Sequence, residues 1–213
     1  MRFGKSLQGA AAAVLFALTM AAPAGAGDII EDWGTAKAPK PPAVKSVTVS
    51  ARDTALLVLD IQTNNCNAKR RPRCVDMVPR VEALLGKARA AGMPVVYALT
   101  GSGTREKVLK PVAPRDGEPH VQASVNKFYG TELEKILKDK GVKTVILVGT
   151  AAEGAVLGTA TGAAARKFKV IVAVDGMASF DPYAEQYTAI YLAKGPGTRR
   201  VTTLTRTGMI EIK

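Results

Sequence analysis

The sequence is poor in the residues that build metal and thiol chemistry. Its 213 residues include one histidine and two cysteines. A four-ligand His/Cys zinc site needs more of these side chains, and a two-histidine H-E-x-x-H motif is excluded. Aromatic residues make up only 5% of the chain and seldom lie among the basic ones, which argues against base stacking on nucleic acid. We therefore predict no metal, no cofactor and no nucleic-acid partner.

Hydrophobic residues are abundant. They make up 47% of the chain, which is too much for a disordered protein. A chain of this length buries roughly 70% of its unfolded surface, so it needs no dense disulfides to fold. The formal net charge is +12. A solvated basic face accounts for this charge, and an anionic substrate attracted by the local field is the alternative.

The first 26 residues have the pattern of a secretory signal peptide. Arg2 and Lys5 precede an almost unbroken apolar run at residues 9–22. This run is shorter than the about 20 residues that a membrane span needs. Small residues at positions 24–26 form a cleavage site. We predict cleavage after Ala26, a periplasmic or secreted protein, and no stable membrane insertion after cleavage; an uncleaved anchor is the alternative.

Export changes the meaning of the two cysteines. Cys66 and Cys74 lie eight positions apart in a loop that also contains four basic residues. In an oxidising compartment two such thiols are expected to form a disulfide. Closing this loop would contribute about 2–3 kcal/mol of stability in the chain-entropy model. A catalytic thiol or two free thiols are the alternatives.

The rest of the chain divides into an arm and one domain. Residues 27–45 contain three prolines and little periodicity, which predicts an extended Pro-rich N-terminal arm. From residue 46 to 213, apolar runs typical of buried strands alternate with helix-spaced segments. The predicted strands are residues 55–59, 95–99, 145–148, 170–174 and 201–204. The predicted helices are residues 75–91, 131–141, 156–167 and 183–193, and residues 101–124 are loop-rich. This order predicts an α/β fold, a Rossmann-like three-layer α/β/α domain with a mainly parallel sheet.

Ligands of such sheets bind beyond the carboxyl ends of the strands. Asp60 ends the first strand, where loss of solvent would raise its pKa and suit proton transfer; a turn or cap aspartate is the alternative. The third strand leads into small residues at 149–156. A helix starting there presents N–H groups to an anion or oxyanion, although tight packing would need the same residues. Asp175, after the fourth strand, is a turn residue or a functional one.

Four segments, taken in order, resemble the isochorismatase-like cysteine hydrolases. They are residues 54–62, residues 88–97, the F-x-G-T-x-L segment at 128–133, and residues 141–179. The resemblance covers about residues 45–205. It implies a Rossmann-like fold, a small-molecule substrate or ligand, and a homo-oligomer.

Members of that family commonly use an Asp, a Lys and a nucleophilic Cys. Their activities include hydrolysis of amides and of the isochorismate vinyl ether, and in the latter case a small residue stands at the Cys position. By position, the Asp corresponds to Asp60, the Cys to Ala155 and the Lys to Gln122, unless a shifted loop brings in Lys127. Alanine cannot attack a carbonyl, so thioester chemistry is excluded. The resemblance thus implies a divergent member that lacks the Cys and also the Lys.

We predict a catalytic site composed of Asp60, Glu153 and Ala155, in which the two carboxylates divide acid and base roles. Glu153 could instead merely favour the positive end of a helix. The residues predicted to bind substrate are Gln62, Gln122, Phe128, Tyr129 and Gly154. The predicted function is an exported hydrolase that acts without a Cys nucleophile. A catalytically silent binding protein is the alternative, and self-association through the arm and the Ala/Gly-rich helix is a third reading.

Overall fold

The computed structural model describes Met1 and residues 27–213. The predicted signal peptide, apart from Met1, lies outside the described residues. The chain divides into two units, residues 1–39 and 40–213. The described part of the first is exposed and contains one short helical turn, η1 (Trp33–Thr35). Among the described residues, none forms a helix with the length and hydrophobicity that a membrane crossing requires.

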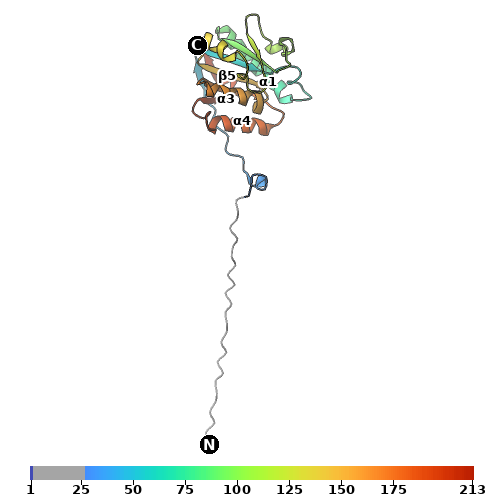
Figure 1. The fold of residues 1–213 in the computed structure, drawn as a ribbon, viewed down its shortest axis with the longest axis vertical. Helices are drawn as coiled ribbons and strands as arrows, with labels where there is room; N and C mark the ends of the chain where they lie inside the picture. The colour runs from blue at the N-terminus through green and yellow to red at the C-terminus, as the bar shows by residue number, and fades with distance from the viewer. Residues whose placement is uncertain (2–26) are drawn as a thin grey trace. The chain divides into compact units, whose positions relative to one another are not determined.

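A six-stranded parallel sheet lies at the centre of the second unit (Figure 1). Its strand order is β4-β3-β2-β5-β6-β7. The strands are β2 (Thr54–Leu59), β3 (Val95–Leu99), β4 (His120–Gln122), β5 (Thr144–Thr150), β6 (Lys169–Ala178) and β7 (Thr202–Thr205). The two central strands, β2 and β5, are buried almost throughout. Continuous apolar runs are typical of strands covered on both faces. The sequence therefore predicted the positions of β2 and β5.

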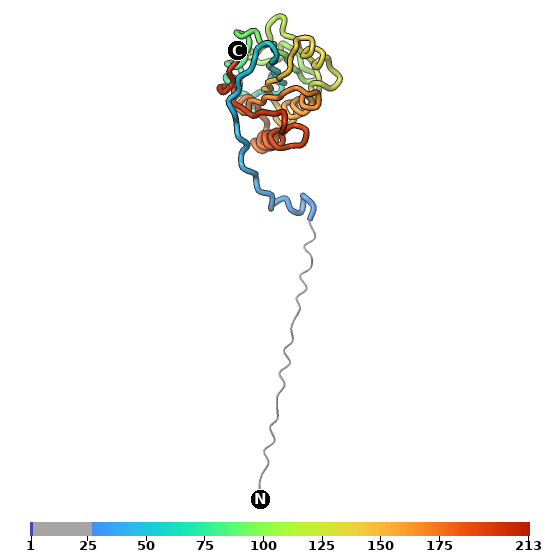
Figure 2. Tube along the Cα trace, turned by 90° about the vertical axis from the view of Figure 1, so that its left-hand side faces the viewer, coloured from blue at the N-terminus to red at the C-terminus, as the bar shows by residue number. Residues whose placement is uncertain are grey.

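Helices cover both faces of the sheet. On one face lie α1 (Pro72–Ala90) and the turns η3 (Lys110–Val112) and η5 (Thr207–Met209). On the other lie α2 (Leu133–Asp139), α3 (Leu157–Ala165) and α4 (Pro182–Lys194). Helices α3 and α4 contact each other, as the orange and red segments show in both views (Figures 1 and 2). The predicted three-layer α/β/α fold with a mainly parallel sheet is confirmed.

Several short elements differ from the predicted pattern. The segment 101–124, predicted as a loop, contains η2 (Arg105–Lys107), η3 and the edge strand β4. Two further strands, β1 (Val47–Val49) and β8 (Ile210–Ile212), form a separate parallel pair. Strands of three residues are too short to show an alternating pattern, so periodicity could not detect them.

Two helix starts also differ. Helix α1 begins at Pro72 rather than at residue 75, because proline fits the first helical position, where its missing N–H is not needed. The helix predicted from residue 156 is preceded by a π-helical turn, η4 (Ala152–Val156), and α3 begins at Leu157. The chain therefore leaves β5 through a wide turn at the carboxyl end of the sheet.

Helix α3 lies very close to the loop that precedes Phe128. A Cβ atom added at Gly158 would lie 2.7 Å from Val125 Cγ1. The Lys127 N–H donates to Thr159 Oγ1 at 3.3 Å. The small residues of this helix face therefore allow the chain's own loop to pack against it and hold Lys127 in place.

Replacing Gly158 with alanine is expected to destabilise the protein. The added methyl group overpacks the contact with Val125, which typically costs 1–3 kcal/mol. The control is Gly86→Ala in α1, where no atom lies within 4 Å of the new Cβ. There alanine should stabilise the helix by roughly 0.5–1 kcal/mol. Urea unfolding compares the two variants, and equal stabilisation by both would contradict the tight contact at α3.

Candidate active site

A cavity of about 540 Å³ opens at the carboxyl ends of the central strands. Its lining includes Asp60 after β2, Thr100 after β3 and the start of η4 after β5. This is where an open parallel sheet places its ligands. A hollow of about 590 Å³ lies at the opposite end, beside β1, but it contains none of the predicted site residues. The cavity at the carboxyl end is therefore the candidate site.

The backbone at Asp60 is held in an unusual conformation. Its φ is 54°, a value that non-glycine residues adopt rarely. The Asp60 N–H donates to the Ala98 carbonyl at 2.9 Å, and its own carbonyl accepts from the Gln62 N–H at 2.8 Å. Strained backbone of this kind persists where surrounding contacts fix it, and it concentrates at functional sites. Asp60 thus enters the cavity wall from a rigid strand end.

The structure brings Lys127 to Asp60. The Lys127 Nζ donates to Asp60 Oδ1 at 2.8 Å, to the Leu99 carbonyl at 3.1 Å and to the Ala123 carbonyl at 2.9 Å. The lysine side chain is completely buried, and that of Asp60 is 8% exposed. All three ammonium donors have partners. The prediction that the chain lacks a lysine at this position is therefore wrong.

Gln122 does not lie beside Asp60, although its position in the sequence corresponds to that of the family lysine. It belongs to the edge strand β4 and donates a hydrogen bond from Nε2 to the Gly103 carbonyl. The ammonium instead reaches Asp60 from position 127, immediately before Phe128. The shifted loop that the sequence left open is the arrangement found. A long side chain can reach one carboxylate from different backbone positions, so spacing alone could not decide between them.

Burial changes the acidity of both members of this pair. It raises the pKa of Asp60 to about 6, because the loss of solvent disfavours the carboxylate more than Lys127 and Arg71 favour it. Loss of solvent likewise lowers the pKa of Lys127, against the opposing effect of Asp60. A carboxyl group that exchanges its proton near the working pH is suited to general acid or base catalysis.

The turn after β5 supplies another wall of the cavity. Gly149 has a φ of 140°, and a Cβ atom there would lie 2.1 Å from the Leu59 carbonyl oxygen. Only glycine therefore lets β5 pass this close to the end of β2. The following η4 turn places Gly154 and Ala155 in the cavity lining. The Gly154 N–H is already engaged, because it donates to the Ala151 carbonyl at 3.2 Å.

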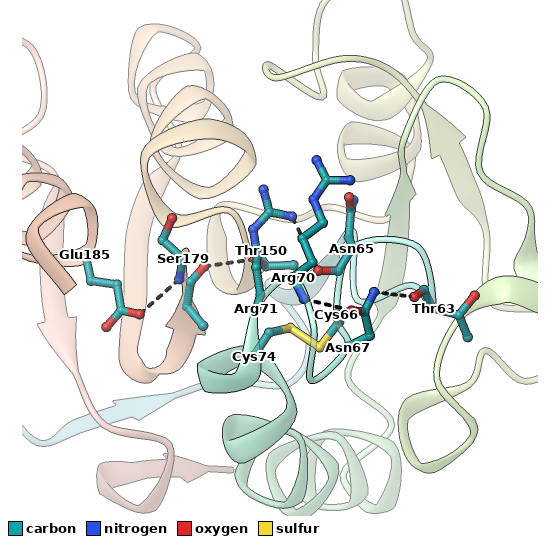
Figure 3. The surroundings of a disulfide bond; sticks show 11 residues. Thr63, Asn65, Cys66, Asn67, Arg70, Arg71, Cys74, Thr150, Ser179 and Glu185 are labelled. Atoms are coloured by element: carbon teal, nitrogen blue, oxygen red, sulfur yellow. Dashed lines mark hydrogen bonds between the residues drawn. A yellow bond between two sulfur atoms is a disulfide. The ribbon is translucent and has the colours of Figure 1, made fainter. Parts of the chain in front are cut away.

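Glu153 lines the same cavity as Asp60. Its carboxylate accepts a hydrogen bond from the Ser179 hydroxyl. The Ser179 N–H donates to Glu185 at 2.9 Å, and Glu185 accepts two bonds from Arg73 at 2.8 and 2.5 Å. Figure 3 shows the Ser179–Glu185 bond beside the disulfide loop. This chain of contacts ties the Glu153 wall of the cavity to the start of α1.

Cys66 and Cys74 form the predicted disulfide, with Cα atoms 5.3 Å apart. Asn65, Arg70 and Arg71 extend from this loop on the side away from the sulfur atoms (Figure 3). Asn65 and Arg71 line the cavity. The disulfide loop therefore forms part of the cavity wall. From the sequence, its basic residues were expected only to attract an anionic substrate through their charge. Arg71 was not predicted as a site residue.

Besides Gln122, three other predicted binding residues lie outside the cavity lining. Gln62 is fully buried, and its Oε1 accepts from the Thr100 N–H at 3.0 Å, so it fixes the loop after β3. Phe128 packs in the core against Phe168, with ring centroids 6.0 Å apart. Tyr129 is 83% exposed. Proximity to Asp60 or to the F-x-G-T-x-L segment did not determine where these side chains point.

Asp175 and His120 also lie outside the cavity lining. Asp175 accepts hydrogen bonds from the Thr207 N–H at 2.7 Å and from its hydroxyl at 2.9 Å, and so ties β6 to η5. The single histidine, His120, is exposed at the start of β4. In the part of the chain that the structure describes, no group of three His, Cys, Asp or Glu side chains is arranged to hold a metal ion.

Comparison with known proteins agrees with this architecture. The isochorismatase domain model matches residues 54–206. The secreted isochorismatase effector Isc1 of Verticillium dahliae is 31% identical over 146 residues, which cover 63% of this chain and 77% of the relative. An uncharacterized isochorismatase family protein of Escherichia coli O157:H7, YecD, is 28% identical over 163 residues, or 65% of this chain and 86% of the relative.

Solved structures show the same fold. An isochorismatase-like hydrolase from Alkaliphilus metalliredigens has a TM-score of 0.67 and 25% identity, covering 73% of this chain and 95% of that one. An N-carbamoylsarcosine amidase from Thermoplasma acidophilum has a TM-score of 0.63 and 24% identity, covering 73% and 96%. The latter likeness concerns the fold alone. Because the domain model spans most of the chain and a relative of 31% identity is covered over 77% of its length, this chain belongs to the isochorismatase family of hydrolases.

Proposed function

We propose that this chain is an exported hydrolase of a small substrate that acts without a covalent nucleophile and uses Asp60 as its acid/base group. The observation that carries the proposal is the buried Asp60–Lys127 pair in the wall of a cavity that Ala155 also lines. A methyl group cannot attack a carbonyl or form a thioester. Water is therefore the attacking species in this proposal.

The contacts of Asp60 suggest how the proton moves. Lys127 occupies Oδ1, which leaves Oδ2 to meet a substrate or water. With a vinyl ether, protonated Asp60 would donate its proton to the double-bond carbon, and water would add to the resulting cation. The hemiketal then breaks into a ketone and an alcohol. Lys127 stabilises the carboxylate that Asp60 becomes during the first step.

Glu153 is the second carboxylate in this mechanism. It lines the cavity and is held by the Ser179 hydroxyl. In this position it would accept the proton that the attacking water loses, while Asp60 provides the acid. Two carboxylates in different surroundings divide acid and base roles in this way in other hydrolases. The burial of Asp60 and the greater exposure of Glu153 support the assignment.

Export is supported by two observations. The Cys66–Cys74 disulfide is typical of an oxidising compartment, and one relative is named as a secreted effector. We expect mass spectrometry of protein recovered outside the cytoplasm to identify Gly27 as its first residue. Intact protein that remains in the cytoplasm with residues 1–26 attached would contradict this assignment. We also propose a homo-oligomer, which light scattering after size exclusion would test.

The catalytic proposal is tested by finding a ligand and following its fate. The exported protein is screened by thermal shift against small amides, vinyl ethers and carboxylates, since a bound ligand raises the melting temperature. Mass spectrometry then follows each hit. A hit that is consumed supports the hydrolase. If every hit survives unchanged, the protein is a silent binding protein, which Ala155 at the nucleophile position would also permit.

Turnover of such a substrate is expected to change steeply near pH 6. The pKa of Asp60 is about 6, and kcat/KM reports the ionisation of the free enzyme. Because Asp60 is the acid in this mechanism, kcat/KM should fall about tenfold per pH unit above 6. A fall below 6 instead would assign the base role to Asp60. A profile that is flat between pH 5 and 7 would exclude Asp60 from proton transfer.

A further inference from the structure

Arg71 has fewer hydrogen-bond partners than a comparable partly buried arginine. Its Nη1 makes one long contact with the Asn65 carbonyl at 3.4 Å, and its Nε is buried without a partner. By contrast, Arg89 donates two bonds of 2.8 Å to Glu118 and further bonds to neighbouring oxygen atoms. A guanidinium has five N–H donors. Arg71 therefore enters the cavity wall with donors that the protein does not use.

The backbone of Arg71 is nevertheless fixed. Its N–H donates to the Asn67 carbonyl at 2.8 Å, and its carbonyl accepts from the Cys74 N–H at 3.0 Å. The disulfide to Cys66 closes the same turn, and Pro72 begins α1 immediately afterwards. Because the backbone is already fixed, a ligand has to restrict only the Arg71 side chain, which favours affinity.

A second residue of the cavity lining also has a side-chain atom without a partner. Thr100 Oγ1 is buried and has no hydrogen bond. Of the four buried side-chain atoms without partners in residues 27–213, two therefore belong to residues that line this cavity. Such atoms typically cost about 1–3 kcal/mol each. The lining of this cavity therefore includes residues whose polar groups the protein leaves without partners.

We propose that Arg71 binds a carboxylate group of the substrate, so that the cavity selects small organic monocarboxylates. The planar guanidinium fork of arginine matches a carboxylate, to which it donates two parallel hydrogen bonds. Asp60 and Glu153 line the same cavity and repel a dianion such as phosphate more strongly than a monoanion. This inference rests on the proposed function only in treating the bound carboxylate as substrate.

Binding of a carboxylate would also act on Asp60. A negative charge in the same cavity disfavours a second one, which keeps Asp60 protonated. Protonated Asp60 is the form that donates a proton to a vinyl ether. An anionic substrate would therefore prepare its own acid catalyst, whereas a neutral substrate would not.

The test measures binding of two probes, benzoate and pyruvate, to the exported protein by calorimetry. Arg71→Gln is expected to weaken binding at least tenfold. The matched control is Arg70→Gln. It removes the same charge from the neighbouring residue, whose side chain is outside the cavity lining. We expect this variant to change the affinity for either probe by less than threefold. Equal losses in both variants, or no binding of either probe to the unaltered protein, would overturn the proposal.

Three further measurements separate the effect of the guanidinium fork from the effects of charge and of the folded turn. Arg71→Lys keeps the charge but loses the fork, and should weaken benzoate binding at least threefold. Benzamide, a neutral molecule of the same shape, should bind Arg71→Gln and the unaltered protein equally. A variant pair, Cys66→Ser with Cys74→Ser, should also bind benzoate more weakly, because the turn that holds Arg71 is released. Unchanged benzoate binding in Arg71→Lys would contradict the paired hydrogen bonds.

The outcomes distinguish this site from the proposed function. If benzoate binding depends on Arg71 but no substrate is ever converted, the anion site stands and the hydrolase fails. If a carboxylate substrate is converted with the same KM by Arg71→Gln, the hydrolase stands and the anion site fails. Phosphate is a further probe, and tighter binding of phosphate than of benzoate would overturn the preference for monocarboxylates.

Discussion

The Asp60→Asn variant is expected to turn over substrate about 10²–10⁴-fold more slowly than the unaltered protein, while remaining folded. Asparagine keeps an oxygen that can accept the hydrogen bond from Lys127, whose ammonium now lies 2.8 Å from Asp60 Oδ1. It has nearly the same shape as aspartate, so the strand end should be preserved. An amide cannot exchange a proton near neutral pH, so the acid/base step is lost.

The measurement is kcat for the first substrate identified, together with the binding of that substrate. We expect binding to persist, because Arg71 and the rest of the cavity are unchanged. The matched control is Asp76→Asn, the same chemical change on an exposed residue of α1 outside this cavity. Its turnover should be unaltered. Full turnover by Asp60→Asn would exclude the proposed mechanism, whatever the identity of the substrate.

The Lys127→Met variant is expected to be destabilised by about 3–5 kcal/mol at neutral pH, the usual result of removing one partner of a buried ion pair. Lys127 is fully buried and forms three hydrogen bonds. Methionine fills much of the same volume but cannot satisfy Asp60. The control is Lys135→Met, whose partner Asp139 forms an ion pair on the surface. Exposed pairs contribute at most about 1 kcal/mol.

The loss in Lys127→Met should also depend on pH. Lys127 lowers the pKa of Asp60 against the larger effect of burial, so its removal raises that pKa further above the unfolded value. A raised carboxyl pKa means that the folded state holds its proton more tightly than the unfolded state does. Stability is therefore lost as pH rises from about 4 through the folded pKa.

Urea unfolding at pH 5 and pH 8 measures this difference. We expect a larger loss at pH 8, where Asp60 must be buried as a charge. Adding Asp60→Asn to Lys127→Met removes that charge and should recover part of the stability at pH 8. Equal losses at the two pH values, or no recovery in the double variant, would show that Lys127 does not act through its charge on Asp60.

Much of the fold was predictable because its signals are local in the sequence. The four main strands are continuous apolar runs, and each was placed within a few residues of its observed bounds, although β6 extends to Ala178. Gly92 marked the end of α1 correctly, because its φ of 67° suits glycine. Export and the spacing of the two cysteines favoured the disulfide that is found. The position of Asp60 directly after a buried strand predicted its place at the strand-end cavity.

Local sequence patterns were thus enough to predict the layered fold, the family and a cavity at the strand ends, and they favoured the disulfide over free thiols. Which side chains meet in that cavity depends on contacts between segments that are far apart in the sequence. The tertiary structure brought Lys127 rather than Gln122 to Asp60, turned Gln62 towards the loop after β3, and placed Arg71 in the cavity wall. This difference arises because strands and helices repeat every few residues and so leave a local pattern in the sequence. A long lysine or arginine side chain, by contrast, can contact the cavity from several loop positions, and loops have no periodic pattern.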